Sequence, residues 1–211
     1  MKLPIVIALA GMLFGCDRKA DQAPAPGPEA VRASRPAADH SSLAAEPAAS
    51  GAPLYDLRLT LTTQEGRRVG LDVFRGQPLL ISMFYGSCGH ACPVLISDIK
   101  RLEKQLPEAA QASLRVLLVS FDPDRDTPER LKALAALHNV DPKRWIFASA
   151  ADPDALSLAA ALGIRYAKLP SGAFHHTSLI TLLDASGKIV AQSEGLGRDN
   201  AALVRWLVQR S

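Results

Sequence analysis

Two cysteines, Cys88 and Cys92, lie where a buried strand passes into a helix, and this junction constrains the fold more than any other stretch of the chain. The apolar run at 79–84 is typical of a buried strand, and the residues from 93 to about 106 carry apolar side chains at helical spacing. Pro93 suits the first turn of that helix, because an N–H group there would have no partner within the helix. The sequence therefore predicts a strand-to-helix turn that carries both thiols.

The position of the two thiols at a helix start points to reactive cysteines. Positive potential at a helix N-terminus lowers the pKa of a nearby thiol and favours the thiolate, which attacks disulfides and binds metals. The alternative is that Cys88 and Cys92 are buried structural residues or form an ordinary stabilising disulfide. Structural pairs seldom lie on an exposed loop that opens a helix, so we favour the reactive interpretation.

The start of the chain contains a short apolar segment that ends at a cysteine. Met1-Lys2 is positive, residues 3–14 are apolar, and this segment has the length of a signal peptide rather than of a transmembrane helix. Its end, LFGC at 13–16, resembles a bacterial lipobox. The resemblance implies a lipoprotein signal peptide at 1–15, cleavage before Cys16, and acyl chains on Cys16 that anchor the protein in a membrane. The alternative is a cleaved secretory signal in which Cys16 has no role.

The residues after Cys16 bear on the location of the protein. Asp17 resembles the signal that keeps enterobacterial lipoproteins on the inner membrane. Residues 16–53 are rich in Ala, Pro, Ser and Gly without apolar periodicity, which predicts a lipidated, disordered tether. The folded domain, at 54–211, would then face the periplasm from the bacterial inner membrane. In that oxidising compartment, a lone cysteine pair must be oxidised, metal-loaded or kept reduced by a partner.

The order of secondary structure from residue 54 onward indicates the fold class. A hairpin at 57–71 comes first, strands then alternate with helices, and a second hairpin at 177–192 precedes a final helix. Strands that alternate with helices favour a mainly parallel central sheet, and the closing hairpin makes that sheet mixed. The prediction is an α/β fold, a thioredoxin-like three-layer sandwich with an added N-terminal β-hairpin. The stretch at 167–173 is expected to be a polar loop.

The length of the chain bounds the number of domains, and its charge distribution bears on the kind of partner. The 211 residues suffice for one domain of ordinary size with a full core. The formal net charge is +3, and acidic and basic residues are interspersed. Because the chain has no basic stripe with interleaved aromatic residues, we do not expect nucleic acid as a partner.

Two histidines late in the chain offer a third metal ligand. His175 and His176 lie just before the strand expected at 177–183. Two thiolates and one imidazole suit copper, since thiolate holds Cu(I) and imidazole also serves Cu(II). Structural zinc is normally held by four protein ligands, so zinc would need His90, a second histidine or water in addition. The alternative is that both residues are loop histidines without a metal, and spacing alone does not say which of them would bind.

Three motifs together carry a resemblance to a known family. CGHACP at 88–93 matches a Cys-x-x-x-Cys-Pro motif after a buried strand, and SFDPDRDTPE at 120–129 matches a Ser-x-Asp-Pro-x-Arg-Asp-Thr-Pro-Glu segment. His176-Thr177, before a strand that ends in LLD, completes the pattern. Over roughly 54–208 the chain resembles the Sco/SenC family, thioredoxin-like copper chaperones that help to assemble the binuclear CuA centre of cytochrome c oxidase. By this resemblance His176, not His175, is the third metal ligand.

The resemblance implies a membrane-anchored metallochaperone rather than an enzyme. Its cargo would be copper, as Cu(I) or Cu(II), bound by Cys88, Cys92 and His176 and passed to the copper subunit of cytochrome c oxidase or to another copper protein. The alternative hypothesis is a thiol:disulfide oxidoreductase or redox sensor that keeps the copper-site cysteines of a partner reduced, with Cys88 and Cys92 as its redox pair. A thiol–disulfide reductant is a further expected partner.

The chain departs from the family pattern at two positions beside these ligands. Gly89-His90 stands where the family usually has Pro-Asp, and His175 stands where the residue before the metal histidine is often Asp. The first change removes a negative charge from the site and offers His90 as an additional ligand or as a base for the thiols. The acidic segment at 122–126 is interpreted as structural, with carboxylates that cap a helix, pair with Arg125 and help to shape the pocket. Thr127, directly before Pro128, is also predicted as an N-cap of that helix.

Overall fold

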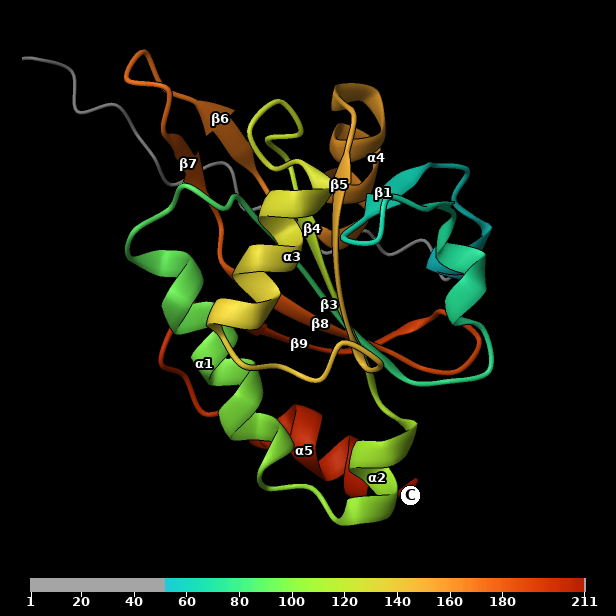
Figure 1. Ribbon diagram of the computed structural model, residues 1–211. Coiled ribbons are helices and arrows are strands. Elements are labelled where there is room, and N and C mark those ends of the chain that lie inside the picture. Colours follow the sequence, from blue (N-terminus) through green and yellow to red (C-terminus); the bar gives the residue numbers. More distant parts are fainter. Residues whose placement is uncertain (1–51, 211) are drawn as a thin grey trace, which may run out of the picture. The chain divides into compact units, whose positions relative to one another are not determined.

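The computed structural model describes residues 52–210 (Figure 1). The predicted signal peptide, the predicted lipid-bearing Cys16 and the predicted tether up to residue 51 lie outside the described residues. Among the helices of 52–210, none is both long enough and apolar enough to cross a bilayer.

A seven-stranded mixed sheet forms the middle of the domain, in the order β2-β1-β5-β4-β3-β8-β9. Its strands are β1 (Leu61–Thr63), β2 (Arg68–Val69), β3 (Leu79–Phe84), β4 (Arg115–Ser120), β5 (Trp145–Ala150), β8 (Leu179–Leu183) and β9 (Ile189–Glu194). Strands β3, β4 and β5 run parallel to one another, whereas β1, β8 and β9 are antiparallel to their neighbours. A separate two-stranded sheet pairs β6 (Tyr166–Lys168) with β7 (Phe174–His176).

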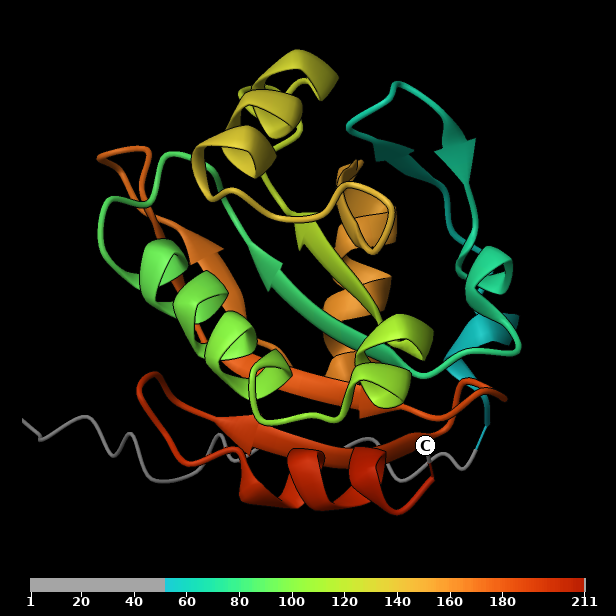
Figure 2. The ribbon, with the colours of Figure 1, turned by 60° about the horizontal axis from the view of Figure 1, so that its bottom comes forward.

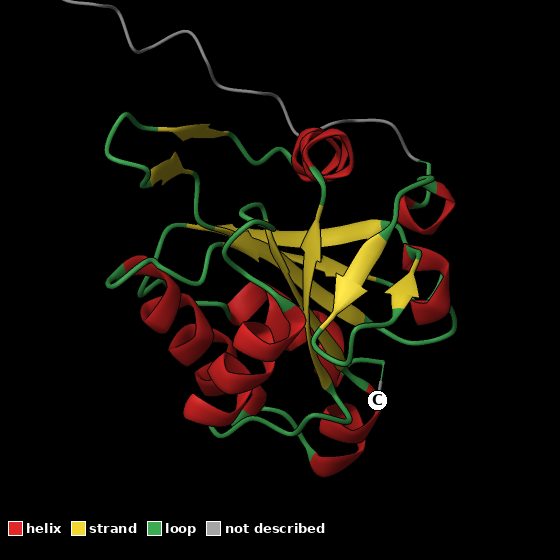
Figure 3. Cartoon of the chain, turned by 45° about the horizontal axis from the view of Figure 1, so that its top comes forward, coloured by secondary structure: helices red, strands yellow, loops and turns green. Residues whose placement is uncertain are grey.

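Helices cover both faces of the large sheet, as Figures 2 and 3 show. They are α1 (Ala91–Glu103), α2 (Glu108–Ser113), α3 (Pro128–Leu137), α4 (Asp152–Leu162), α5 (Ala201–Val208) and the short 3-10 helices η2 (Leu54–Asp56) and η3 (Leu71–Phe74). Successive side chains of a strand point to opposite faces, so β3 serves two cores. Leu79, Ile81 and Met83 pack with α4, η2 and η3, whereas Leu80 and Phe84 pack with α1, α2, α3 and α5.

The predicted α/β fold, a thioredoxin-like three-layer sandwich with a mixed sheet, is confirmed. The added N-terminal hairpin β1–β2 joins the sheet beside β5, and the second hairpin β8–β9 extends the other edge beside β3. Two elements differ from the sequence prediction. Helix α2 was not expected, and β6 and β7 form a hairpin around the stretch 167–173 that was expected to be a loop. Each of these strands is three residues long and too short to show apolar alternation.

Helix α1 begins two residues earlier than the sequence predicts, and this shift matters for the cysteines. His90 is the N-cap residue and Ala91 the first helical residue, so Cys92 lies within the first turn. Pro93 is then the third helical residue, where an N–H group has no intrahelical partner. The carboxyl ends of β3 and β4 meet at this edge of the sheet, where ligand sites of α/β folds commonly lie.

Candidate metal centre

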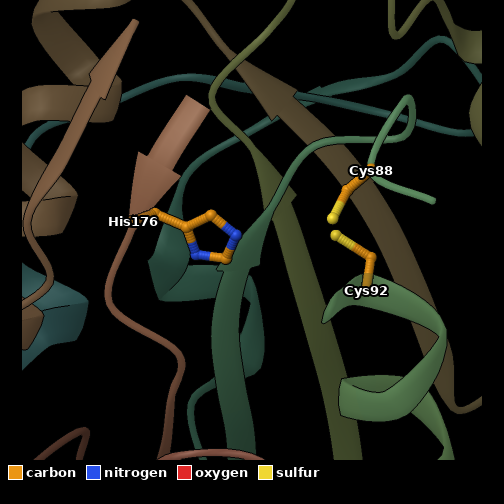
Figure 4. A group of neighbouring side chains, drawn as sticks. All are labelled: Cys88, Cys92 and His176. Atoms are coloured by element: carbon orange, nitrogen blue, oxygen red, sulfur yellow. The ribbon is translucent and has the colours of Figure 1, made fainter. Parts of the chain in front are cut away.

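Three predicted ligands meet at the carboxyl end of β3. Cys88 lies on the loop after β3, Cys92 lies in the first turn of α1, and His176 ends β7. Their sulfur and imidazole nitrogen atoms all lie within 4.8 Å of one another. Figure 4 shows one ring nitrogen of His176 facing the two sulfur atoms. The fold therefore brings together residues that are far apart in the sequence.

His90 and His175, the two further candidate ligands, do not belong to this group. The side chain of His90, at the N-cap of α1, is exposed. His175 is exposed as well, because neighbouring side chains of a strand point to opposite faces and His176 takes the inner one. Both side chains thus lie on the surface beside the centre.

The pKa values of the two thiols are shifted in opposite directions. Burial alone raises the pKa of the Cys88 thiol, but the backbone N–H groups of His90, Cys92 and Ala91 and the Cys92 thiol together lower it below its ordinary value. Burial strongly raises the pKa of Cys92, whose thiol donates to the carbonyl of Tyr85 at 3.2 Å. The expectation that a helix start lowers the pKa of the thiols thus holds for Cys88. At Cys92 the effect of burial is larger, and the pKa is raised.

His176 is held as a neutral imidazole. Burial lowers its pKa, and the neighbouring His175 adds to this effect, so the ring is uncharged at neutral pH. Its Nδ1 lies 3.3 Å from the carbonyl oxygen of Thr177. Because a carbonyl can only accept, this contact places the proton on Nδ1 and leaves the lone pair of Nε2 for a metal.

Aromatic side chains form the wall behind His176. The rings of Phe121 and Tyr85 lie edge-on to the imidazole, with centroids at 5.4 and 5.8 Å, and Phe174 packs on both of them. Burial raises the pKa of the Tyr85 hydroxyl, and the neighbouring Cys88 adds to this effect. Tyr85 was not predicted as a site residue, although its position directly after β3 and before the cysteine loop was a usable signal.

A buried carboxylate fixes the cysteine loop to the end of β4. Asp126 is fully buried, and its Oδ2 accepts from the backbone N–H of Gly86 at 2.7 Å and from the hydroxyl of Ser120. Its Oδ1 lies 3.4 Å from Nε of Arg130. A Cβ atom on Gly86 would lie 2.4 Å from Oδ1 of Asp126, so only glycine allows this close approach. The acidic segment is structural, as predicted, and Thr127 caps α3 as expected, whereas the predicted capping of this helix by a carboxylate is wrong.

Arg125 joins three segments around the site. Its Nε lies 3.2 Å from Oδ2 of the buried Asp122, which confirms the predicted pairing. Its Nη2 donates to the carbonyl of Gly172 at 2.7 Å, and its Nη1 donates to the hydroxyl of Ser87 at 3.5 Å. Gly172 lies in the hairpin that carries His176, and Ser87 directly precedes Cys88. The guanidinium group therefore links the hairpin to the cysteine loop.

The geometry suits a single soft metal ion. Two atoms bonded to one ion at about 2.3 Å lie at most about 4.6 Å apart, so donors within 4.8 Å need only a small adjustment to share an ion. A thiolate-prone sulfur, a second sulfur and a neutral imidazole are a donor set that copper prefers. The three protein donors are fewer than the four of a structural zinc site.

Comparison with known proteins assigns the chain to a family. A model of the SCO1/SenC family matches residues 47–207. The chain belongs to the SCO1/SenC family. The predicted membership is thereby confirmed for the part of the chain that carries the fold and the candidate metal centre.

The chain is similar in sequence to a curated protein and in fold to solved structures. The SCO1 protein homolog of Bacillus subtilis is 26% identical over 140 residues, which are 65% of this chain and 72% of the relative. ScoI of Bradyrhizobium japonicum, solved with copper bound, is 24% identical with a TM-score of 0.61 over 72% of this chain and 97% of that structure. A SCO1/SenC family lipoprotein of Bacillus anthracis is 21% identical with a TM-score of 0.66 over 74% of this chain and 95% of that structure.

The difference between the two thiols predicts the order of their alkylation. Iodoacetamide at neutral pH should modify Cys88 before Cys92, because a lowered pKa provides thiolate at Cys88 while Cys92 stays protonated. Mass spectrometry of peptides after timed quenching measures both rates across a pH series. The Cys88 rate should begin to rise at a lower pH than that of free cysteine. Faster alkylation of Cys92 would contradict the prediction.

Loss of the Arg125 side chain should loosen the hairpin that carries His176. Arg125→Ala removes the hydrogen bond to Gly172, worth about 1 kcal/mol, so amide exchange across 166–176 should accelerate by about fivefold. Hydrogen–deuterium exchange with mass spectrometry measures this rate. Arg165→Ala removes an exposed arginine beside the same hairpin and should leave the rate unchanged. Equal effects of the two variants would argue against the link.

Proposed function

We propose that this protein binds copper at Cys88, Cys92 and His176 and delivers it to a partner protein. The observation that carries the proposal is the convergence of two sulfur atoms and one imidazole nitrogen within 4.8 Å. Membership of the SCO1/SenC family and the copper-bound relative from Bradyrhizobium japonicum support copper as the metal. Copper is the cargo of the reaction in this proposal.

The three donors differ in whether they must lose a proton to bind the ion. Cys88 loses its proton more readily than an ordinary thiol, His176 supplies a neutral nitrogen, and Cys92 must release its proton when the ion binds. Delivery is an exchange of ligands, in which sulfur or nitrogen atoms of the partner replace these donors one at a time and the ion keeps its charge. Both cysteines must be reduced for loading, and both are free thiols in the structure.

The proposed recipient is the copper subunit of cytochrome c oxidase, during assembly of its CuA centre, or a related copper enzyme. Family resemblance supports this recipient. The lipobox-like segment at 13–16 supports a lipid anchor on Cys16 in the bacterial inner membrane, with the domain in the periplasm. A relative from Bacillus anthracis that is described as a lipoprotein agrees with such an anchor. A thiol–disulfide reductant would keep the cysteines available.

The unequal thiols favour a second function, exchange of thiols and disulfides. The Cys88 thiolate would attack a disulfide of the partner and release one thiolate of that partner. Cys92 would lose its proton and attack the mixed disulfide, which leaves the partner reduced and the Cys88–Cys92 pair oxidised. The observation behind this alternative is that Cys88 is half-exposed and activated, whereas Cys92 is buried and protonated. A thiol reductant would then restore the pair.

The variant His176→Ala tests the copper function. Removal of one of three donors should lower the affinity for Cu(I) by about a hundredfold or more, since loss of an outer partner alone costs 10- to 100-fold. Competition with a chromophoric Cu(I) chelator under reducing conditions measures the affinity. The variants His175→Ala and His90→Ala remove exposed neighbours and should bind copper as the parent does.

Two results would overturn the copper proposal. One is a reduced parent protein that takes up no stoichiometric copper, and the other is an affinity that His176→Ala leaves unchanged. The same variant should retain most of its rate of disulfide exchange, because neither sulfur is altered. Full function of His176→Ala in cells would therefore favour the thiol–disulfide alternative.

A further inference from the structure

A basic pocket lies away from the candidate metal centre. It has a volume of about 480 Å³ and is lined by the N-terminal hairpin, η3 and the starts of β4 and β5. Arg67, Arg115 and Lys143 supply its positive charge, and no residue that lines it is acidic. Val69, Val73, Phe74 and Ile146 add apolar surface to the lining of the same pocket. Cations over apolar side chains suit a ligand that is both anionic and apolar.

The cations of this pocket are free to bind an anion. Arg115 donates only to carbonyl oxygens of the backbone, and among residues 52–210 neither Arg67 nor Lys143 forms an ion pair with a carboxylate. Asp141, near Lys143 in the sequence, pairs with Arg144 at 3.2 Å. Asp141 also lies close enough to Lys143 for its carboxylate to feel that charge, so the uncompensated positive potential of the pocket comes mainly from Arg67 and Arg115.

Val73 adds an exposed apolar side chain to this basic surface. It is 58% exposed, although it belongs to η3, whose Leu71 and Phe74 are buried in the core. An apolar residue among exposed cations is the pattern of surfaces that rest at a membrane interface, where cations meet phosphates and apolar groups reach the acyl boundary. A site for a small soluble anion would gain nothing from Val73.

The pocket and the metal centre lie at opposite ends of strand β4. Arg115 starts β4, and Ser120, at the other end of this strand, binds the carboxylate that holds the cysteine loop. Six residues of strand span about 20 Å, which sets the separation of the two sites. Figure 1 shows β3 and β4 running from the side of η3 to the loop before α1.

The chain enters the domain beside the basic pocket. The hydroxyl of Tyr55, in η2, donates to the carbonyl of Gln77 at 3.2 Å, and Gln77 lines the pocket. Helix η2 also packs on η3, and Arg75 next to η3 pairs with Asp56. The first described element, η2, therefore lies on the side of the pocket.

We infer that this basic pocket rests on the anionic phosphate headgroups of the membrane and turns the metal centre away from the bilayer. The inference rests on the lipid anchor of the proposed function, which brings the domain to a membrane. Arg67, Arg115 and Lys143 bind the phosphates, and Val73 meets the apolar boundary beneath them. The cysteines and His176 then face the side from which a partner approaches.

Chemical modification of lysine on vesicles tests this orientation. The lipidated full chain is reconstituted in vesicles of phosphatidylcholine, with and without phosphatidylglycerol, and treated with a water-soluble amine reagent before mass spectrometry. Lys143 should react at least about fivefold more slowly on the anionic vesicles, because the negative surface attracts each basic residue by about 1 kcal/mol and shields it from the reagent. Lys168, exposed on β6 near the metal centre, should react equally on both. High salt should abolish the difference.

Variants separate the pocket from general charge. Arg67→Gln with Arg115→Gln should restore fast modification of Lys143 on anionic vesicles. Arg198→Gln with Arg205→Gln removes the same charge from exposed positions elsewhere and should leave the protection intact. Equal rates for Lys143 on both vesicles, with the chain shown by flotation to be anchored, would overturn the inference.

Other outcomes assign the pocket differently or remove its premise. Protection by inorganic phosphate without vesicles would indicate a site for small anions, and protection by polyglutamate alone would indicate an acidic protein. Either result would overturn the membrane assignment. A chain that floats with neither vesicle would refute the anchor and the orientation together. Copper affinity is not part of this measurement, so the metal-binding proposal stands or falls separately.

Discussion

A buried carboxylate holds the candidate metal centre in shape. Asp126 accepts from the N–H of Gly86 and from Ser120, and so fixes the start of the cysteine loop against the end of β4. A buried carboxylate without such partners would be strongly destabilising, so the fold needs Asp126 and its two hydrogen-bond donors together. The loop position in turn sets the N–H groups of α1 around Cys88. The activation of Cys88 therefore depends on a residue 38 positions further along the chain.

The fold places two chemically different thiols on either side of the start of α1, Cys88 on the loop before it and Cys92 in its first turn. Cys88 stays near solvent, where backbone N–H groups stabilise its thiolate, and Cys92 faces the core formed by α1 and β3. Cys88 is accessible to an incoming ion or disulfide. Cys92 acts in the second step, as a further metal ligand or as the thiol that resolves the mixed disulfide. His176 reaches the pair from a hairpin outside the main sheet, and Arg125 links this hairpin to the cysteine loop. Both functional hypotheses draw on this asymmetry.

The sheet and the main helices could be predicted because they follow from strong apolar patterns, whereas the meeting of Cys88, Cys92 and His176 was expected only from the family resemblance. Apolar runs identify β3 and β4, and the family motif singled out His176 from its neighbour. The burial of Cys92 was not visible, since it depends on α1 starting at Ala91 and packing on the sheet. The roles of Asp126 and Tyr85 depend on contacts across the fold, which local patterns do not encode. The hairpin β6–β7 is too short for its pattern to be recognised.

X-ray absorption of the copper-loaded, reduced protein tests the central claim most directly, because it counts the donor atoms around the ion. The structure predicts two sulfur atoms and one imidazole nitrogen, with loss of the nitrogen in His176→Ala and no change in His175→Ala or His90→Ala. Two nitrogen donors in the parent protein would bring a second histidine into the site. A spectrum with fewer than two sulfur donors, or one that His176→Ala leaves unchanged, would contradict a copper centre formed by Cys88, Cys92 and His176.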